Sequence, residues 1–330
     1  MSSTEKTTGT ASAGDPKPVR KRRLLGQRLP WLYVIARHNQ ARLGLALLLV
    51  LVLMAIFAPV IAPGDPSQSY DIINDPPSHE HILGTDSQGR DEFALMVWGG
   101  RVTLVIGFGT AALAIVIATL VGVIAGYFRG FVDEFLMLVT NLFLIIPGLV
   151  LLVVLAAYLK PGTGTVILAL AFTGWAFHAR IIRAMTLSLR EKDYIAAAVV
   201  AGERSFSIIF RLILPNMTNL IVGGFIGSTI YGIGASTALS YLGLTRMTDI
   251  SWGTNLFFAQ NGNSLLSGAW WAFVPSGVCV ALAALGLAWI NFGMDEISNP
   301  RLRAERELRK ALGRKAARRV RATPVKEREH

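Results

Sequence analysis

Long apolar runs alternate with polar segments along the middle of the chain. Six runs reach or approach the ~20 residues with which an α-helix crosses the ~30 Å hydrocarbon core of a bilayer. These runs are residues 43–62, 102–127, 135–159, 162–179, 217–245 and 265–294. The fifth and sixth exceed one crossing, so we expect their ends to tilt or to emerge. The pattern predicts an all-α polytopic membrane protein with six transmembrane helices.

The polar segments differ in character. Residues 1–42 begin with a Ser-, Thr-, Gly- and Pro-rich stretch that we expect to be disordered. Their basic end contains an amphipathic piece, 29–36, expected at the membrane surface. Residues 63–101 form a long loop expected outside the cytoplasm, residues 102–294 form a core with the other five spans, and residues 295–330 form a basic tail expected to contact anionic lipid.

Charge orients this arrangement. The chain is 52% hydrophobic and only 16% charged, against about 25% charged in an ordinary soluble domain. Of the 32 Lys and Arg residues, 28 fall in segments 1–42, 128–134, 180–216 and 295–330, which share one side of a six-span protein. The positive-inside rule predicts that this side, with both termini, is cytoplasmic. Because the net charge of +11 is spread over tails and loops, we expect lipid contact and no nucleic acid.

The segment between the fourth and fifth spans, residues 191–216, is helix-competent, amphipathic and expected to face the cytoplasm. Asp193 is placed to cap a helix start. Tyr194, Ala197 and Ala198 then follow at helical spacing with Ala201 and form a stripe of mostly small side chains. Gly202 is a permissive position at which this short helix can end.

A second short helix is predicted after Gly202. Phe206, Ile209, Phe210 and Ile213 form its apolar face. Pro215 lacks a backbone donor and is expected to break this helix before the fifth span. Two interpretations remain open: the pair of helices lies on the membrane for packing alone, or it docks a soluble partner.

The segment resembles the EAA loop of bacterial ABC importer permeases. Ala197 and Ala198 match the alanine pair, Gly202 matches the glycine, and Pro215 lies in a matching terminal I-L-P-N. Ala196 occupies the position of the usual glutamate. The resemblance implies docking to an ATPase subunit by shape rather than by an ion pair from this position.

Further residues complete the predicted coupling surface. Asp193, Glu203 and Arg204 are candidates to replace the charge that is missing at Ala196. Tyr194 and Phe206 are the aromatic members of this surface.

Further motifs resemble the C-type subunits of oligopeptide and dipeptide permeases, the DppC/OppC-like chains. Residues 81–91, HILGTDSQGRD, resemble H-P-L-G-T-D-x-x-G-R-D before the second span, with Ile82 for proline. Residues 241–244, 251–253 and 299–303 resemble F-L-G-L, S-W-G and D-P-R-L-R. These motifs occur in family order between about residues 78 and 303.

The resemblance implies the type I ABC importer permease fold (MetI-like) in the bacterial inner membrane. It implies a pore shared with a B-type permease, two cytoplasmic ATPase subunits and an extracytoplasmic peptide-binding protein. This chain is then not an enzyme and binds no cofactor or metal, since the ATPase subunits bind ATP and Mg. Relatives with the same motifs carry nickel complexes, sugars or other small solutes, so peptide cargo has alternatives.

The outer segments hold a charged cluster, Asp86, Arg90 and Asp91, and a tryptophan, Trp252. One interpretation is contact with the binding protein. The alternative for the cluster is a turn that satisfies its own charges, with Gly84 supplying an unusual backbone angle. Trp252 is alternatively an anchor at the membrane interface.

Candidate pore-lining residues are Asn141 in the third span and Gly227 and Ser236 in the fifth. Asn141 is equally suited to bonding a neighbouring helix. His178 precedes two arginines and is predicted at the cytoplasmic interface. Cys279 is expected to be a buried, inert thiol.

Other functional classes lack their residues. A stand-alone secondary carrier or channel, the alternative from a different class, usually needs a charge deep within a span, and none of the predicted spans has one. The chain has no GxxxxGK[ST] loop and no HExxH motif, which argues against direct ATP binding and intramembrane proteolysis.

Overall fold

The structure, a computed structural model, describes residues 39–298, and the described chain is helical with no β-strand. The predicted disordered N-terminus, the surface helix at 29–36 and the basic tail from 299 lie outside the described residues. The elements in chain order are α2 Asn39–Ile56, α3 Ala58–Ile61, α4 Glu92–Phe128, α5 Gly130–Ile145, α6 Gly148–Tyr158, α7 Thr163–Arg190, α8 Asp193–Val200, α9 Ser205–Ile208, η1 Ile209–Ile213, η2 Leu214–Met217, α10 Thr218–Tyr241, α11 Trp252–Asn261, η3 Trp270–Ala272 and α12 Val274–Ser298.

The described helices agree with the predicted all-α membrane fold. Five of them are long and apolar enough to cross a membrane, and the bent pair α5–α6 makes a sixth span if it counts as one. The two halves of this pair meet at 87°. Ile146 is extended (φ −71°, ψ 126°) because a residue that precedes proline avoids the helical region, so α5 ends before Pro147.

Several span boundaries differ from the prediction. α4 begins at Glu92, ten residues before the predicted start, because Asp91 caps it by accepting a hydrogen bond from the Ala94 amide. α7 continues to Arg190 although its last turns contain three arginines. The last span begins only at Val274, since residues 262–269, with Gly268 at φ +77°, form a separate loop that leads into the short η3.

Glycines allow the central helix α4 to approach its neighbours closely. A Cβ added at Gly122 would lie 2.7 Å from the Ala179 carbonyl oxygen of α7, and one at Gly232 of α10 would lie 3.1 Å from Gly107 of α4. Gly44 of α2 faces the Gly286 carbonyl of α12 in the same way, at 2.5 Å. Small residues at crossings bring helix backbones together, the usual packing of membrane bundles.

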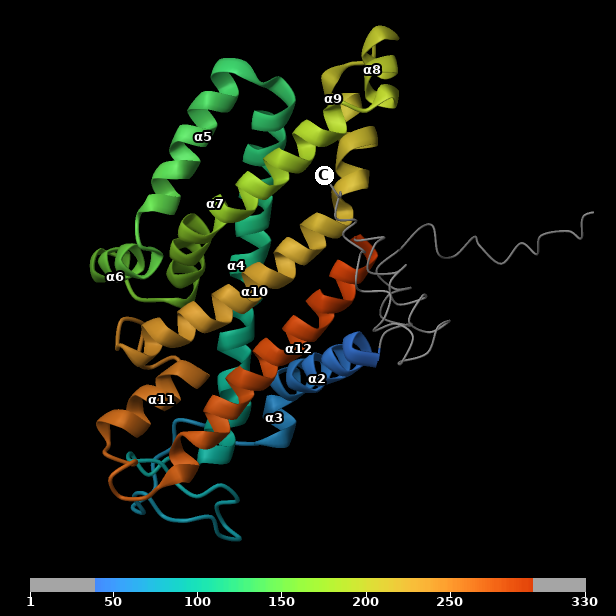
Figure 1. The fold of residues 1–330 in the computed structure, drawn as a ribbon. Coiled ribbons are helices and arrows are strands. Elements are labelled where there is room, and N and C mark those ends of the chain that lie inside the picture. The colour runs from blue at the N-terminus through green and yellow to red at the C-terminus, as the bar shows by residue number, and fades with distance from the viewer. Residues whose placement is uncertain (1–38, 299–330) are drawn as a thin grey trace, which may run out of the picture.

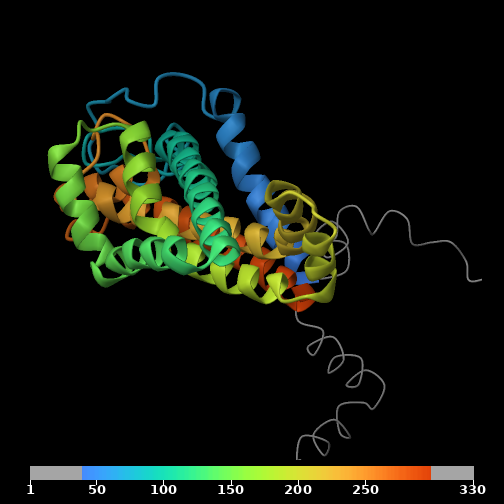
Figure 2. The same cartoon turned by 90° about the horizontal axis from the view of Figure 1, so that it is seen from above.

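The bundle has two distinct ends (Figures 1 and 2). α8 and α9 extend beyond the other helices at one end (Figure 1, yellow), and the segment between α3 and α4 lies with α11 at the opposite end. Functional segments predicted for opposite sides of the membrane therefore occupy opposite ends of the molecule.

Candidate functional site

The projection is formed by α8, residues 201–204, α9 and η1, and its α8 and α9 extend beyond the other helices at one end of the described bundle (Figure 1). Gly202 ends α8 with φ +79°. The Gly202 amide donates to the Val199 carbonyl at 3.0 Å, and the Glu203 amide donates to the Ala198 carbonyl at 3.1 Å. This double pattern is a Schellman cap, which satisfies the last carbonyls of the helix. The predicted helix end at Gly202 is confirmed.

Isoleucines hold the projection on the bundle. Ile195 of α8, Ile208 of α9 and Ile213 of η1 are each at most 1% exposed and pack with Ile182 and Met217. Burying one such side chain stabilises the folded state by about 1.5–3 kcal/mol. α8 is therefore fixed to the ends of α7 and α10 rather than being a loose loop.

Aromatic and aliphatic side chains cover the outer surface of the projection. Phe206 and Phe210 stack with their ring centroids 6.2 Å apart and are 73% and 59% exposed. Val200 is 89% exposed and Tyr194 44% exposed. The predicted apolar face of the second helix is thus divided, because Ile209 and Ile213 face inward while the two phenylalanines face outward.

Pro215 does not break the helical path, contrary to the prediction. Residues 209–213 form a π-helical turn and 214–217 a 3₁₀ turn, and the helix continues into α10. The wider π turn accommodates the missing proline donor and the bulk of its ring. The projection is consequently joined to α10 by continuous helix.

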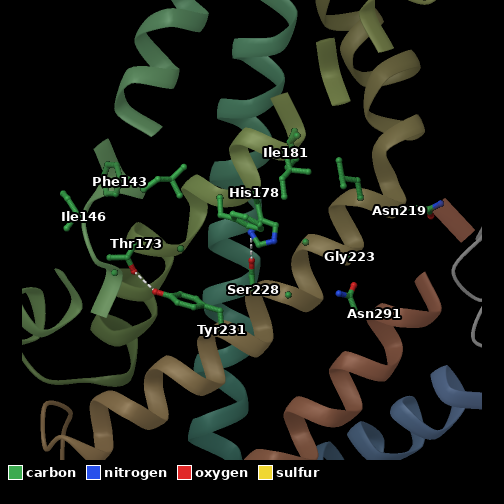
Figure 3. Close-up of a pocket in the computed structure, with 18 residues that line it drawn as sticks. Phe143, Ile146, Thr173, His178, Ile181, Asn219, Gly223, Ser228, Tyr231 and Asn291 are labelled. Carbon is green, nitrogen blue, oxygen red and sulfur yellow. Dashed lines mark hydrogen bonds between the residues drawn. The ribbon is translucent and has the colours of Figure 1, made fainter. Parts of the chain in front are cut away.

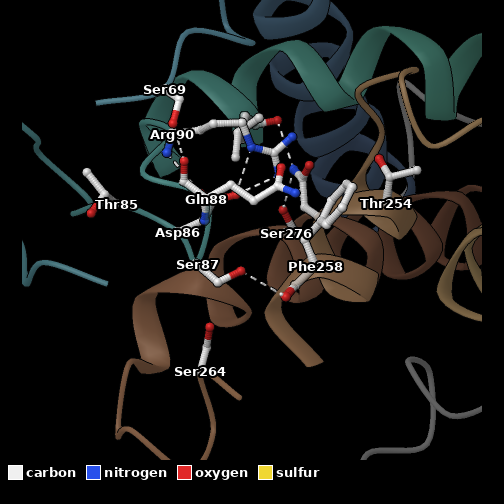
Figure 4. A network of polar contacts seen from close by, with 12 residues as sticks. Ser69, Thr85, Asp86, Ser87, Gln88, Arg90, Thr254, Phe258, Ser264 and Ser276 are labelled. Atoms are coloured by element: carbon white, nitrogen blue, oxygen red, sulfur yellow. Dashed lines mark hydrogen bonds and ion pairs between the residues drawn. The ribbon is translucent and has the colours of Figure 1, made fainter. Parts of the chain in front are cut away.

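At the opposite end, the motif in residues 81–91 folds into a tight turn with buried charges (Figure 4). The Asp86 carboxylate accepts hydrogen bonds from the Arg90 guanidinium at 2.6 and 2.9 Å and from the Gln88 and Arg90 amides at 2.8 Å. The Arg90 guanidinium also lies 4.6 Å from the centre of the Phe258 ring. This turn ties the outer segment to α11.

Backbone geometry explains the glycines of this turn. Gly84 and Gly89 have φ +72° and +73°. A Cβ at Gly84 would lie 2.4 Å from the Asp75 carbonyl oxygen, and one at Gly89 would lie 2.1 Å from that of Tyr70. No other residue fits there without displacing backbone.

A pocket of about 640 Å³ opens between α7 and α10, with the α5–α6 bend and α12 at its sides (Figure 3). The Thr173 and Tyr231 hydroxyls are 3.1 Å apart, and Ser228 Oγ lies 3.4 Å from His178 Nδ1, so two contacts join α7 to α10 along the pocket. Its lining is otherwise apolar and glycine-rich, with two asparagine amides.

Ion pairs fasten α5 to α7 between the pocket and the projection. The Arg183 guanidinium donates two hydrogen bonds of 2.5 Å to the Asp133 carboxylate, and Arg180 donates to Asn141 Oδ1 at 2.7 Å. Arg129 pairs with Glu191 at 3.0 Å, where α7 leads into α8. The partners of Arg180 and Arg183 explain why α7 stays helical through these two arginines.

Comparison with family models identifies the architecture. The model of the binding-protein-dependent transport system inner membrane component matches residues 118–304, more than half of the chain. The chain belongs to this family. A second model, the N-terminal TM domain of oligopeptide transport permease C, matches residues 31–77. The permease is thus a multi-pass component of the inner membrane, in agreement with its five or six apolar helices.

Curated relatives of the permease carry peptide-transport names. It is 36% identical over 273 residues to a putative peptide transport system permease protein of Brucella abortus, covering 82% of this chain and 91% of the relative. It is 32% identical over 272 residues to the dipeptide transport system permease protein DppC of Bacillus subtilis (82% and 84%). The oligopeptide transport system permease protein OppC of the same species is 32% identical over 300 residues (89% and 95%).

The predicted coupling residues of the permease lie on the projection, except for Pro215, which lies in η2. All are exposed except Ala198, which is half-buried: Asp193, Tyr194, Ala196, Ala197, Gly202, Glu203, Arg204, Phe206 and Pro215. Asp193 is not the cap, since α8 begins at that residue after Lys192 and no side chain caps it. Its carboxylate instead lies in the first turn, where negative charge is favourable. Docking through these residues stays a prediction.

Most of the residues predicted to contact the binding protein are buried. Trp252 is fully buried, donates to the Met96 carbonyl at 2.9 Å and is not an interfacial anchor. Asp86 and Arg90 are 2% and 8% exposed, which matches the self-satisfied turn. Asp91 caps α4 and pairs with His81 at 2.8 Å. Its side chain is 24% exposed, so it alone of the four retains appreciable accessible surface.

Of the predicted pore-lining residues, only Gly227 lines the pocket. Ser236 is 3% exposed and donates back to the Ile233 carbonyl within α10. Asn141 bonds Arg180, which matches its alternative interpretation as a link to a neighbouring helix.

His178, Tyr231, Asn219 and Asn291 line the pocket and were not predicted there. The sequence predicts His178 at the cytoplasmic interface because Arg180 follows it closely, but α7 continues to Arg190. The i, i+4 series 219, 223, 227 and 231 in α10 was the available signal, since residues with this spacing share one helix face.

Proposed function

We propose that this permease is one of two pore-forming subunits of an ATP-driven importer of peptides, and that its projection docks an ATPase subunit. The observation that carries the proposal is a Schellman-capped, anchored and exposed projection in a chain of this family. Names of relatives support peptide cargo, among them those of the DppC and OppC chains of Bacillus subtilis.

The geometry of the projection suits mechanical coupling. A capped helix anchored by Ile195 and Ile208 moves as one body with the ends of α7 and α10. Phe206, Phe210 and Val200 offer exposed apolar surface in a segment with the charge bias of the cytoplasmic side. An ATPase cleft that covers these side chains on ATP-driven closure would displace α7 and α10 together, which is rigid-body switching.

The remaining assembly follows from the same proposal. A B-type permease forms the other half of the pore, and an extracytoplasmic binding protein delivers the peptide. Two ATPase subunits bind ATP and Mg. Both termini of this chain lie in the cytoplasm.

Reconstitution tests this function. The permease, its B-type partner, the ATPase pair and the binding protein are placed in proteoliposomes, and uptake of radiolabelled di- and tripeptides is measured with and without ATP. We expect uptake that requires ATP and every subunit. Uptake by this chain without an ATPase would show a carrier or channel, and ATP-driven uptake of a nickel complex or sugar in place of peptides would reassign the cargo.

A further inference from the structure

The pocket between α7 and α10 has the size and composition of a ligand site. Its volume of about 640 Å³ lies within the ~300–1,000 Å³ of small-molecule pockets, which combine apolar walls with a few polar groups. Phe143, Phe177 and Ile181 supply apolar walls (Figure 3). The pocket occupies the middle of α7, with eleven residues of that helix between His178 and Arg190.

The hydrogen-bonding groups of the pocket have unused capacity. His178 Nδ1 faces Ser228, and its Nε2 has no hydrogen-bond partner within residues 39–298. The Thr173 hydroxyl lies 3.1 Å from the Ala169 carbonyl, to which it can donate. Tyr231 can then donate to Thr173 and keep its oxygen as an acceptor.

Two asparagines extend this row along the pocket. The side-chain amides of Asn219 and Asn291 make no hydrogen bond to other groups of the described chain. Each offers one acceptor oxygen and two donor hydrogens. The pocket therefore presents both donors and acceptors, which are the partners that the C=O and N–H groups of a peptide main chain require.

Charge narrows the class of ligand. No Asp, Glu, Lys or Arg occurs among the described residues that line the pocket. A site that selects an ion or a charged side chain would need a counter-charge in this low-dielectric setting. Neutral donors and acceptors instead match the amide N–H and C=O groups, which every peptide shares whatever its side chains.

Glycines of α10 leave space for the His178 ring and for a ligand beside it. A Cβ at Gly224 would lie 2.9 Å from the His178 ring, so the ring reaches its position only because residue 224 is glycine. A Cβ at Gly223 or Gly227 would meet only Asn291 or His178, at 3.4 and 3.6 Å. The α10 surface is thus open to close approach by a main chain.

We propose that this pocket binds main-chain amides of a peptide in passage, through His178, Tyr231, Asn219 and Asn291. The inference rests on the proposed function and adds a recognition site within the membrane helices. It accounts for passage of peptides of different sequence, because the contacts avoid the side chains.

The test compares two tripeptides in the complete reconstituted importer. They are identical except that one is methylated on the amide nitrogen of its central residue. Each is supplied at saturating concentration with the binding protein, and initial uptake rates are expressed as a ratio. The variants are Tyr231→Phe, which removes one hydroxyl, and His178→Leu. The matched control is Leu168→Ala, on α7 but outside the pocket lining. ATP hydrolysis stimulated by the loaded binding protein reports that each complex is assembled.

We expect the wild-type complex and Leu168→Ala to favour the unmethylated peptide by roughly two- to tenfold, the ratio for one net hydrogen bond. In Tyr231→Phe or His178→Leu this ratio should fall toward one while stimulated ATP hydrolysis persists. Ratios unchanged from wild type in both variants overturn the pocket inference and leave the importer intact. Absence of ATP-driven peptide uptake in the wild-type complex overturns the proposed function and, with it, this inference.

Discussion

Gly202 is required for its backbone angle and not for lack of space. An added Cβ there meets nothing within 4 Å, yet φ is +79°. A left-handed conformation costs an ordinary residue about 1–2 kcal/mol, whereas asparagine tolerates it better. Substitutions at this position therefore separate loss of the cap from steric block of docking.

The first prediction uses this distinction. Gly202→Ala should destabilise the cap by about 1–2 kcal/mol and lower ATP-driven uptake, because the amides of residues 202 and 203 lose their geometry. Gly202→Asn, the matched control, should retain more of both. Hydrogen–deuterium exchange of residues 199–204 measures the cap, and uptake measures coupling. Equal exchange in the two variants would contradict the backbone argument.

A second residue-scale prediction concerns the buried Asp86–Arg90 pair. Asp86→Ala leaves the Arg90 guanidinium buried without its carboxylate, and breaking such a pair costs about 3–5 kcal/mol. Thermal unfolding in detergent, followed by tryptophan fluorescence, measures the loss. The double variant Asp86→Ala/Arg90→Leu should be more stable than Asp86→Ala alone. A single variant as stable as wild type would show that the turn does not depend on the pair.

At the scale of elements, hydrophobic length predicted the helices but not their ends. The all-α fold followed from the apolar runs, and the bend between α5 and α6 lies at a proline, Pro147. The true length of α7 could not be predicted, since Arg180 and Arg183 are stabilised by Asn141 and Asp133, which are distant in sequence. The projection could be predicted because it depends on residues that are close in sequence. The pocket could not, because it forms only where α7 and α10 lie side by side.

The third prediction tests the link between α5 and α7. Asp133→Arg places an arginine against Arg183 and replaces the ion pair between α5 and α7 by repulsion. Uptake should fall, since α5 is then no longer tied to the movement of α7. The swap Asp133→Arg/Arg183→Asp re-forms the pair in reverse and should recover part of the activity. A coupling energy of about 0.5–3 kcal/mol is expected from the cycle of unfolding free energies. A swap no better than its single variants would assign the defect to other contacts of these residues.

For the whole molecule, the opposite ends of the bundle imply opposite sides of the membrane. The projection carries Val200, 89% exposed, and the loop between α11 and η3 carries Leu266, 87% exposed. The chain has one cysteine, Cys279, so its replacement gives a cysteine-free background. The orientation deduced from the 28-to-4 charge bias can then be tested at single sites.

The fourth prediction is made in the Cys279→Ala background, in intact cells treated with a membrane-impermeant maleimide. Leu266→Cys should react from outside, whereas Val200→Cys should react only after the membrane is opened, because the charge bias predicts a cytoplasmic projection. Tyr241→Cys, 42% exposed at the C-terminal end of α10, serves as a second outer site. Labelling of Val200→Cys in intact cells, with Leu266→Cys protected, would invert the topology. An inverted projection could not reach a cytoplasmic ATPase, so this outcome would also remove the basis for ATP-driven coupling through Gly202 and its neighbours.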